Sequence, residues 1–217
     1  MKSILSKIYW QTLGLLTNLP ALDLREIIHW SNRNFSMPAP HIVKIQTLKR
    51  WGGEEVWIES GTYLGDTATS LASFAKQVIT YEPSIKYFNL ASKKLKFYSN
   101  IDLKLGSSEL LLEKILGQLS ATGKVNDLSF WLDGHYSSGE TYKGMNDTPI
   151  LEELAVIQKY LSKIKTLTIC IDDVRLFRTD IETPEKYPES YELTNWANMH
   201  GLYCVTEHDI FIITNRK

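Results

Sequence analysis

The chain has 217 residues, of which 43% are hydrophobic, and it carries a formal net charge of -1 at pH 7 with a pI near 6.5. This length and apolar content fit one large domain with a full core. The near-zero charge lacks the basic footprint that nucleic acid backbones and anionic membrane surfaces require, so we expect neither among the partners. Cys170 and Cys204 lie in apolar runs without metal or redox spacing, which favours buried reduced thiols and a cytoplasmic protein.

Residues 1–50 are expected to form a helical extension that belongs to the same unit as a domain at 51–217. The first 22 residues are partly apolar, but polar residues such as Lys7 and Gln11 interrupt the run. It never approaches the ~20 apolar residues that span a bilayer. We therefore expect an amphipathic helix that packs on the domain or on a second subunit. Packing on a second subunit would make the protein a homo-oligomer.

From residue 56 onward, short β-rich runs alternate with helical patterns, which is typical of a parallel sheet covered by helices. The last run carries Glu207 and Asp209 in its middle and is too long for one strand, so we predict two antiparallel strands joined by a tight turn. The expected fold is a Rossmann-like, doubly wound α/β sheet of seven strands with an antiparallel last strand. The predicted runs are 56–60, 77–82, 102–106, 128–133, 167–172 and 202–215.

Apolar residues between these runs recur with a period near 3.6, which predicts crossover helices over 68–75, 112–119 and 150–161. The last of these is expected to begin with Thr148 as its N-cap and Pro149 at its first position. Glu152 and Glu153 would then lie in the first turn, where the helix dipole favours acids.

A glycine turn follows the first strand. The strand ends in Glu59, and the chain passes Gly61 and Gly65 before a helix that starts around Asp66. Glycines allow positive φ and close approach of a ligand, and the helix N-terminus offers free N–H groups, so the turn suits a nucleotide. It is not the dinucleotide motif G-x-G-x-x-G, because Glu59 holds the first glycine position. A purely structural glycine turn remains an equal alternative.

Glu82 ends the second strand some 20 residues after the glycine turn. An acid at this spacing can accept hydrogen bonds from both hydroxyls of a ribose, although an exposed loop acid is the alternative. Gly106 and Ser107 end the third strand, near where an adenine ring would lie.

Taken together, Glu59-x-Gly61-x-x-x-Gly65, Glu82, Asp133 after the fourth strand and the final hairpin resemble the class I S-adenosylmethionine-dependent methyltransferases. The likeness covers roughly residues 54–217. It implies that S-adenosylmethionine binds across the carboxyl ends of the first two strands. Carried onto this chain, the implied cofactor residues are Glu59, Gly61, Thr62, Tyr63, Gly65, Asp66, Thr67, Glu82, Ser107 and Asp133.

Three acids follow neighbouring strands: Asp133 after the fourth, and Asp172 and Asp173 after the fifth. Neighbouring parallel strands deliver their ends to one crevice, and three carboxylates there repel one another unless a cation neutralises them. Oxygen ligands of this kind suit Mg²⁺ or a similar divalent ion. The arrangement is similar to metal-dependent O-methyltransferases of the catechol and, more closely, the macrocin type, which implies these three acids as ligands.

The implied reaction is O-methylation of a hydroxyl on a small molecule such as a sugar, glycoside or phenol. The metal would act as a Lewis acid, and a general base would remove the proton. The catechol type places a lysine base three residues after its first acid, where this chain has Tyr136, so our candidates are His135 and Asp133. The segment 134–148 is long enough for a lid. Arg175 follows the acid pair, either gripping an anionic substrate or lying solvated in a loop.

Two other classes of protein stay open. A nicotinamide-dependent oxidoreductase is disfavoured by the missing G-x-G-x-x-G and by the antiparallel hairpin. A noncatalytic methyltransferase-like binding module would make the acid cluster incidental.

Overall fold

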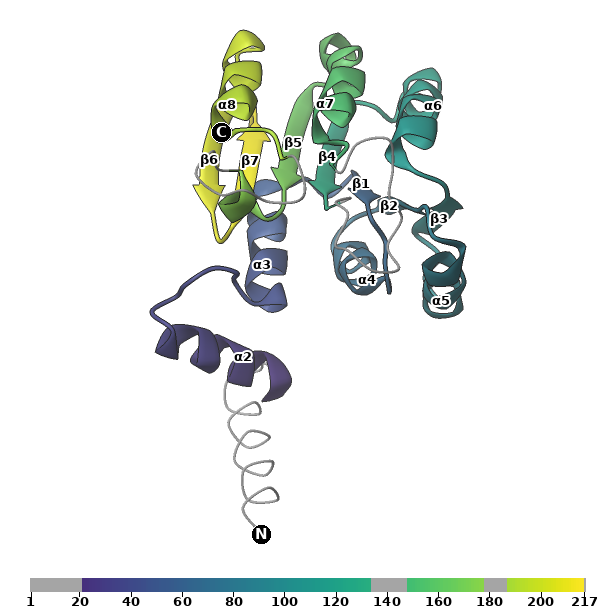
Figure 1. Ribbon diagram of the computed structural model, residues 1–217. Helices are drawn as coiled ribbons and strands as arrows, with labels where there is room; N and C mark the ends of the chain where they lie inside the picture. Colours follow the sequence, from purple (N-terminus) through teal and green to yellow (C-terminus); the bar gives the residue numbers. More distant parts are fainter. Residues whose placement is uncertain (1–20, 134–147, 178–186, 217) are drawn as a thin grey trace.

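The computed structural model describes residues 21–133, 148–177 and 187–216 of the chain. Its centre is one seven-stranded sheet in the order β3-β2-β1-β4-β5-β7-β6 (Figure 1). All neighbouring strands are parallel except β7, which runs antiparallel to both β5 and β6. The expected seven-stranded sheet with a reversed last strand is therefore confirmed. The strands are β1 Val56–Ser60, β2 Gln77–Glu82, β3 Ile101–Leu105, β4 Asp127–Leu132, β5 Thr166–Ile171, β6 Tyr203–Glu207 and β7 Ile210–Thr214.

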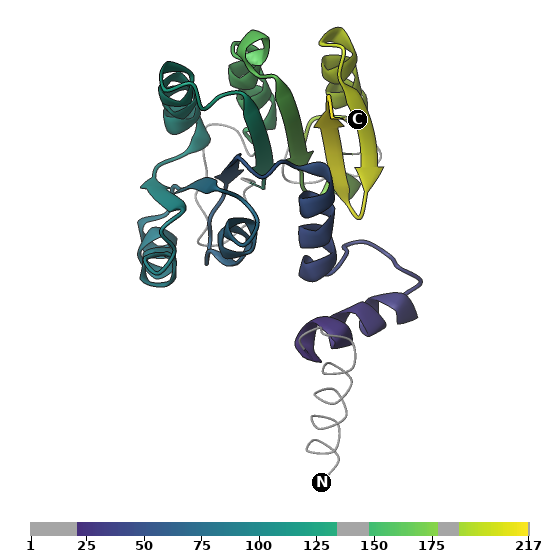
Figure 2. The ribbon, with the colours of Figure 1, turned by 180° about the vertical axis from the view of Figure 1, so that it is seen from behind.

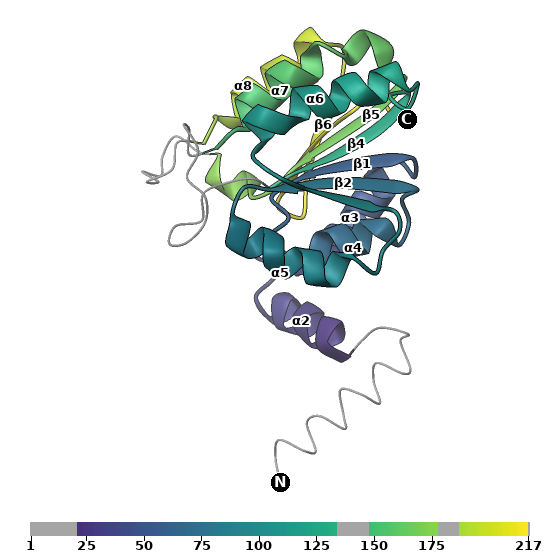
Figure 3. The same cartoon turned by 90° about the vertical axis from the view of Figure 1, so that its right-hand side faces the viewer.

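Helices cover both faces of the sheet, which Figure 3 shows in profile and Figure 2 from behind. One face carries α3 His41–Trp51, α4 Asp66–Ala72 and α5 Ile85–Leu95. The other carries α6 Ser108–Ala121, α7 Ile150–Gln158 and α8 Ser190–Met199. A further helix, α2 Ala21–Asn32, lies beyond α3 on the first face, and two short 3₁₀ turns complete the elements, η1 Leu161–Lys163 and η2 Val174–Leu176. No helix in the described part of the chain has the length and apolar character needed to cross a membrane.

The alternation of side chains along the strands builds two cores. In β1, Val56 and Ile58 pack in the core under α6, α7 and α8, whereas Trp57 points to the core under α3 and α4. All five residues of β1 are buried, as expected of a central parallel strand covered on both faces. The edge strands β3 and β6 are more exposed because each has a neighbour on one side only.

Several boundaries differ slightly from expectation. The strands β3, β4 and β5 begin and end one residue earlier than predicted, which puts Asp133 and Asp172 just past strand ends. Helix α7 starts at Ile150 with Pro149 at the N-cap, so the prediction of Thr148 as N-cap is wrong by one residue. Pro149 takes φ and ψ of -85° and 10°, outside the helical region, so the first helical residue is Ile150. In the final hairpin, His208 and Asp209 have φ of 52° and 70°, which confirms the tight turn.

Helix α3, which lies in the expected N-terminal extension, is a full part of the fold. Ile45 and Leu48 are buried in the same core as Trp57, and the Thr168 hydroxyl donates to the Trp51 carbonyl at 2.8 Å. The expected boundary at residue 50 falls within the last turn of this helix. The extension's predicted role in oligomer formation stays a prediction.

Candidate functional site

The turn between β1 and α4 lies at the carboxyl edge of the sheet. The N–H groups of Gly61 and Thr62 donate to the Tyr81 carbonyl at 3.2 and 3.3 Å, which holds the turn against the end of β2. Gly65 has a φ of 78°, and a Cβ atom there would lie 2.9 Å from Leu95 Cδ2. The turn thus requires glycine at this position both for its backbone conformation and for space.

Glu82 faces this turn and is 5% exposed. Its Oε2 atom accepts a hydrogen bond from the Tyr63 N–H at 2.8 Å, and its Oε1 atom accepts one from the Ser84 N–H at 2.9 Å. Burial raises the pKa of Glu82, while the bonds from Ser84 and Tyr63 act to lower it. Its burial rules out the exposed loop acid, and each carboxylate oxygen retains capacity for a further donor.

Glu59 lies beneath the turn and is 1% exposed. Its Oε2 atom accepts a hydrogen bond from the Thr80 hydroxyl at 2.6 Å, and Thr80 also contacts the Thr62 hydroxyl. The Oε1 atom has no hydrogen-bond partner among the described residues. Burial raises the pKa of Glu59 to about 8, against the lowering effect of the Thr80 bond, so its carboxyl group is mostly protonated at pH 7.

The other predicted cofactor residues lie around the same edge. Ser107 is buried at the N-cap of α6, and the preceding Gly106 donates its N–H to the Glu82 carbonyl at 3.0 Å. Thr67 is half-buried, while Asp66 is exposed and pairs with Lys94 at 2.6 Å. The turn, Glu82 and Ser107 therefore meet in one region, with Asp66 at its solvent side.

The acids after β4 and β5 meet as predicted. The Asp133 N–H donates to the Ser60 carbonyl at 3.3 Å and the Asp172 N–H to the Leu132 carbonyl at 3.1 Å, so the ends of β1, β4 and β5 are adjacent. Asp133 is half-buried, and both Asp172 and Asp173 are buried. Burial first, and then the charge of Asp133, raise the pKa of Asp172 to about 7.

Two protein cations pair with these acids: Lys44, which the sequence patterns did not place here, and Arg175, which follows the acid pair in the sequence. Lys44 Nζ, from α3, donates to the Asp172 carboxylate at 2.5 and 2.7 Å and lies 3.4 Å from Asp173 Oδ1. Burial has the largest single effect and acts to lower the pKa of Lys44, but the charge and hydrogen bond of Asp172 together with the charges of Asp173 and Asp133 hold that pKa above the usual value. Arg175 Nη1 donates to Asp173 Oδ1 at 2.5 Å and also pairs with the fully buried Asp209, so it does not lie solvated in a loop.

Lys44 had one signal in the sequence. It precedes Leu48 by one helical turn and lies on the same side of α3 as this buried leucine. A lysine on the apolar side of a helix is rarely buried unless it is paired. That position predicts an acidic partner inside the fold, although it does not say which one.

The residues present do not fit the predicted metal ion. No group of three His, Cys, Asp or Glu side chains within the described ranges is arranged to hold one. Asp172 already binds the Lys44 ammonium, and Asp173 binds Arg175, so protein cations stand where the ion was expected. The metal site at Asp133, Asp172 and Asp173 is therefore not supported. The candidate base His135 and all but the last residue of the lid predicted over 134–148 lie outside the described residues.

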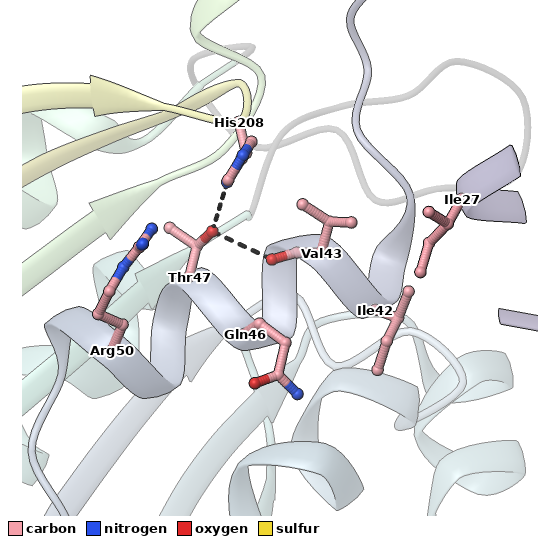
Figure 4. Close-up of a pocket in the computed structure, with 7 residues that line it drawn as sticks. All are labelled: Ile27, Ile42, Val43, Gln46, Thr47, Arg50 and His208. Atoms are coloured by element: carbon pink, nitrogen blue, oxygen red, sulfur yellow. Dashed lines mark hydrogen bonds between the residues drawn. The ribbon is translucent and has the colours of Figure 1, made fainter. Parts of the chain in front are cut away.

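A cavity of about 430 Å³ lies between α2, α3 and the β6–β7 turn (Figure 4). The Thr47 hydroxyl donates to the Val43 carbonyl at 3.0 Å and contacts His208 Nδ1 at 2.8 Å. None of the predicted cofactor residues is among those lining it, so it is separate from the glycine turn. Its lining residues are Ile27, Ile42, Val43, Gln46, Thr47, Arg50 and His208.

The cysteines are both free. Cys170 is fully buried in β5, and burial raises the pKa of its thiol, which keeps the thiol neutral. Cys204, expected to be buried, is only half-buried because β6 is an edge strand.

Comparison with known proteins agrees with this fold. No family model matches the chain, and no curated protein matches it. Among solved structures, an O-methyltransferase from Bacillus cereus in complex with SAH is 14% identical, with 94% of each chain covered and a TM-score of 0.54. A SAM-dependent methyltransferase from Aquifex aeolicus is 14% identical over 82% of this chain and 93% of its own, with a TM-score of 0.46. At these identities the likeness concerns the fold, and the chain has the Rossmann-like methyltransferase fold that the sequence predicted.

Proposed function

We propose that this protein binds S-adenosylmethionine and transfers its methyl group to a hydroxyl oxygen of a small molecule such as a sugar, glycoside or phenol. The observation that carries the proposal is the pair of buried acids around the glycine turn. Glu82 is held by the Tyr63 N–H at the mouth of the turn, and one buried oxygen of Glu59 has no hydrogen-bond partner in the part of the chain that the structure describes. The fold agrees, since it is shared with solved methyltransferases.

The described residues fit the cofactor's two polar ends. Glu82 would accept hydrogen bonds from the two ribose hydroxyls, because its carboxylate is fixed by backbone donors and retains free acceptor capacity. Glu59 lies under the turn, where its unpartnered Oε1 suits the cationic amino group of the methionine portion. Gly65 permits a close approach of the ligand to the N-terminus of α4.

When bound, S-adenosylmethionine would supply an electrophilic methyl group on a sulfonium. Transfer forms an oxygen–carbon bond and breaks the carbon–sulfur bond, and the hydroxyl proton goes to a base of the protein. Asp133, half-buried at the end of β4, and His135, outside the described residues, are the proposed bases. The proposed transfer uses no metal ion, because Asp172 and Asp173 are already paired with Lys44 and Arg175. The near-neutral charge of the chain supports a small acceptor over nucleic acid or a membrane. The two free cysteines favour the cytoplasm as its compartment.

Calorimetry tests cofactor binding. We expect S-adenosylmethionine and its demethylated product to bind the wild type, and Glu82→Ala to weaken binding by about 1 to 3 kcal/mol, the range for hydrogen bonds to charged groups. Glu113→Ala is the matched control, because Glu113 is an exposed glutamate paired with Lys159 on the surface. Equal affinity in wild type and Glu82→Ala, or tighter binding of NAD or NADP than of S-adenosylmethionine, contradicts the proposal.

Transfer is tested with methyl-labelled cofactor and a panel of hydroxylated sugars, glycosides and phenols. We expect label in at least one hydroxyl-bearing acceptor, and no transfer by Asp133→Asn if Asp133 is the base. Binding of the cofactor without transfer to any acceptor, amines and thiols included, would favour a noncatalytic binding module instead.

A further inference from the structure

We propose that the pair Asp172–Asp173 is a cation site whose resident cation is the ammonium of Lys44, so that Lys44 takes the position that the sequence predicted for a divalent ion. The inference rests on the proposed methyl transfer for its functional meaning, since it names Lys44 as the residue that positions Asp172 and Asp173 next to Asp133, one of the proposed bases. It rests on contacts alone for its geometry.

The Lys44 ammonium reaches both carboxylates of the pair. Nζ lies 2.5 and 2.7 Å from the two oxygens of Asp172 and 3.4 Å from Asp173 Oδ1. Mg²⁺ and Ca²⁺ bind carboxylate oxygens at about 2.0 to 2.6 Å. A divalent ion bridging the same oxygens would therefore have to occupy nearly the same point as Nζ, and the two cations exclude each other by volume and by charge.

Two further contacts engage the oxygens of the pair. Asp172 Oδ1 accepts the Asp173 N–H at 2.8 Å, and Asp173 Oδ1 accepts Arg175 Nη1 at 2.5 Å. Asp173 has a φ of 58°, which turns its backbone so that η2 can follow at once and bring Arg175 to both Asp173 and Asp209. Each carboxylate of the pair thus has a protein cation of its own.

The packing of α3 on the sheet fixes the position of Lys44. Its helix, α3, is held on the sheet by the buried Ile45 and Leu48. The side chain of Lys44 is 12% exposed, and those of Asp172 and Asp173 are 9% and 12% exposed. A buried ion pair of this kind is costly to open, because withdrawal of the ammonium leaves the Asp172 carboxylate desolvated and without its cation. The helix before β1 is therefore part of the site itself.

The test measures Mn²⁺ binding to the full chain by electron paramagnetic resonance of the free ion, with thermal unfolding in parallel, and without S-adenosylmethionine. We expect no binding by the wild type up to about 1 mM Mn²⁺, the weak end of ordinary protein sites for divalent ions. Lys44→Gln removes the ammonium and is expected to create a Mn²⁺ site. Mn²⁺ should then raise the melting temperature of this variant, and a second substitution, Asp172→Asn, should abolish both effects.

Lys94→Gln is the matched control, because Lys94 pairs with Asp66 on the exposed surface, and it is expected to bind no Mn²⁺. Lys44→Arg keeps the positive charge on the same helix and is also expected to bind no Mn²⁺. It is the variant to measure if Lys44→Gln does not fold. The proposal is overturned if the wild type or Lys44→Arg binds Mn²⁺ and the added substitution Asp172→Asn removes that binding. So would a folded Lys44→Gln that gains no site.

The outcome is independent of the proposed function. Calorimetry with S-adenosylmethionine is run on the same samples. Failure of the methyltransferase proposal would appear as absent cofactor binding in the wild type. Failure of the Lys44 proposal would appear in the Mn²⁺ measurements alone, as binding by the wild type or as a folded Lys44→Gln that gains no site.

Discussion

The replacement Glu59→Gln tests the electrostatics beneath the glycine turn. Glu59 is buried without a charged partner among the described residues, and burial raises its pKa from the ordinary 4.5 to about 8 in the folded protein. The folded chain therefore holds a proton between these two pH values that the unfolded chain releases. Stability that is present at low pH is lost as the pH rises through this window, by about 1.4 kcal/mol per pH unit.

The magnitude follows from the window. Between pH 5 and pH 7 the wild type should lose roughly 2 to 3 kcal/mol of unfolding free energy through Glu59 alone. Glutamine has nearly the same shape and can still accept the Thr80 hydroxyl, but it does not titrate. Relative to the wild type, Glu59→Gln should therefore gain about the same 2 to 3 kcal/mol between pH 5 and pH 7.

The assay is urea unfolding of both proteins at pH 5, 6 and 7, without ligand. Glu113→Gln is the control, because Glu113 is exposed and paired on the surface, and its difference from the wild type should stay nearly constant with pH. A difference between Glu59→Gln and the wild type that does not change with pH, or that moves toward destabilisation as pH rises, refutes the reasoning.

Three further outcomes are expected. Binding of S-adenosylmethionine at pH 7 should release a proton, because a cationic ligand group favours the ionised form of Glu59. Calorimetry in buffers of different ionisation enthalpy measures this proton release, and Glu59→Gln should show none. Gly65→Ala should destabilise the fold by about 1 to 2 kcal/mol and weaken cofactor binding. Gly123 also has a positive φ, of 72°, but has open space around it, so Gly123→Ala should leave cofactor binding unchanged. Equal cofactor binding by the two variants contradicts the role of the turn. Arg175→Met should cost about 3 kcal/mol in urea unfolding because it leaves the buried Asp209 without its cation, and a cost below about 1 kcal/mol would contradict this.

Much of the fold could be predicted because its signals are local. The short β-rich run of β1 and the period near 3.6 in α4, α6 and α7 are set by neighbouring residues, and strand limits came within one residue of the structure. The positive φ values of His208 and Asp209 follow from a turn between two strands that must pair at once. The start of α7 was missed by one residue because the conformation of Pro149 depends on its packing.

The candidate site was predicted in part for the same reason. Parallel strands deliver their carboxyl ends to one edge, so the meeting of Glu82 with the turn, and of Asp133 with Asp172, follows from strand order alone. The burial of Glu59 and its partnerless oxygen do not follow from strand order. They depend on which side chains close over β1, and only the packed structure contains that information.

What the sequence determined by itself is thus the set of elements, their order and the edge at which the acids gather. Which cation neutralises those acids was decided by tertiary structure. Lys44 is 128 residues from Asp172 in the chain, and Asp209 is 34 residues from Arg175, so neither pair leaves a local pattern. The acids required a positive charge because burial raises the free energy of unpaired carboxylates, and the fold meets that requirement with a lysine from α3.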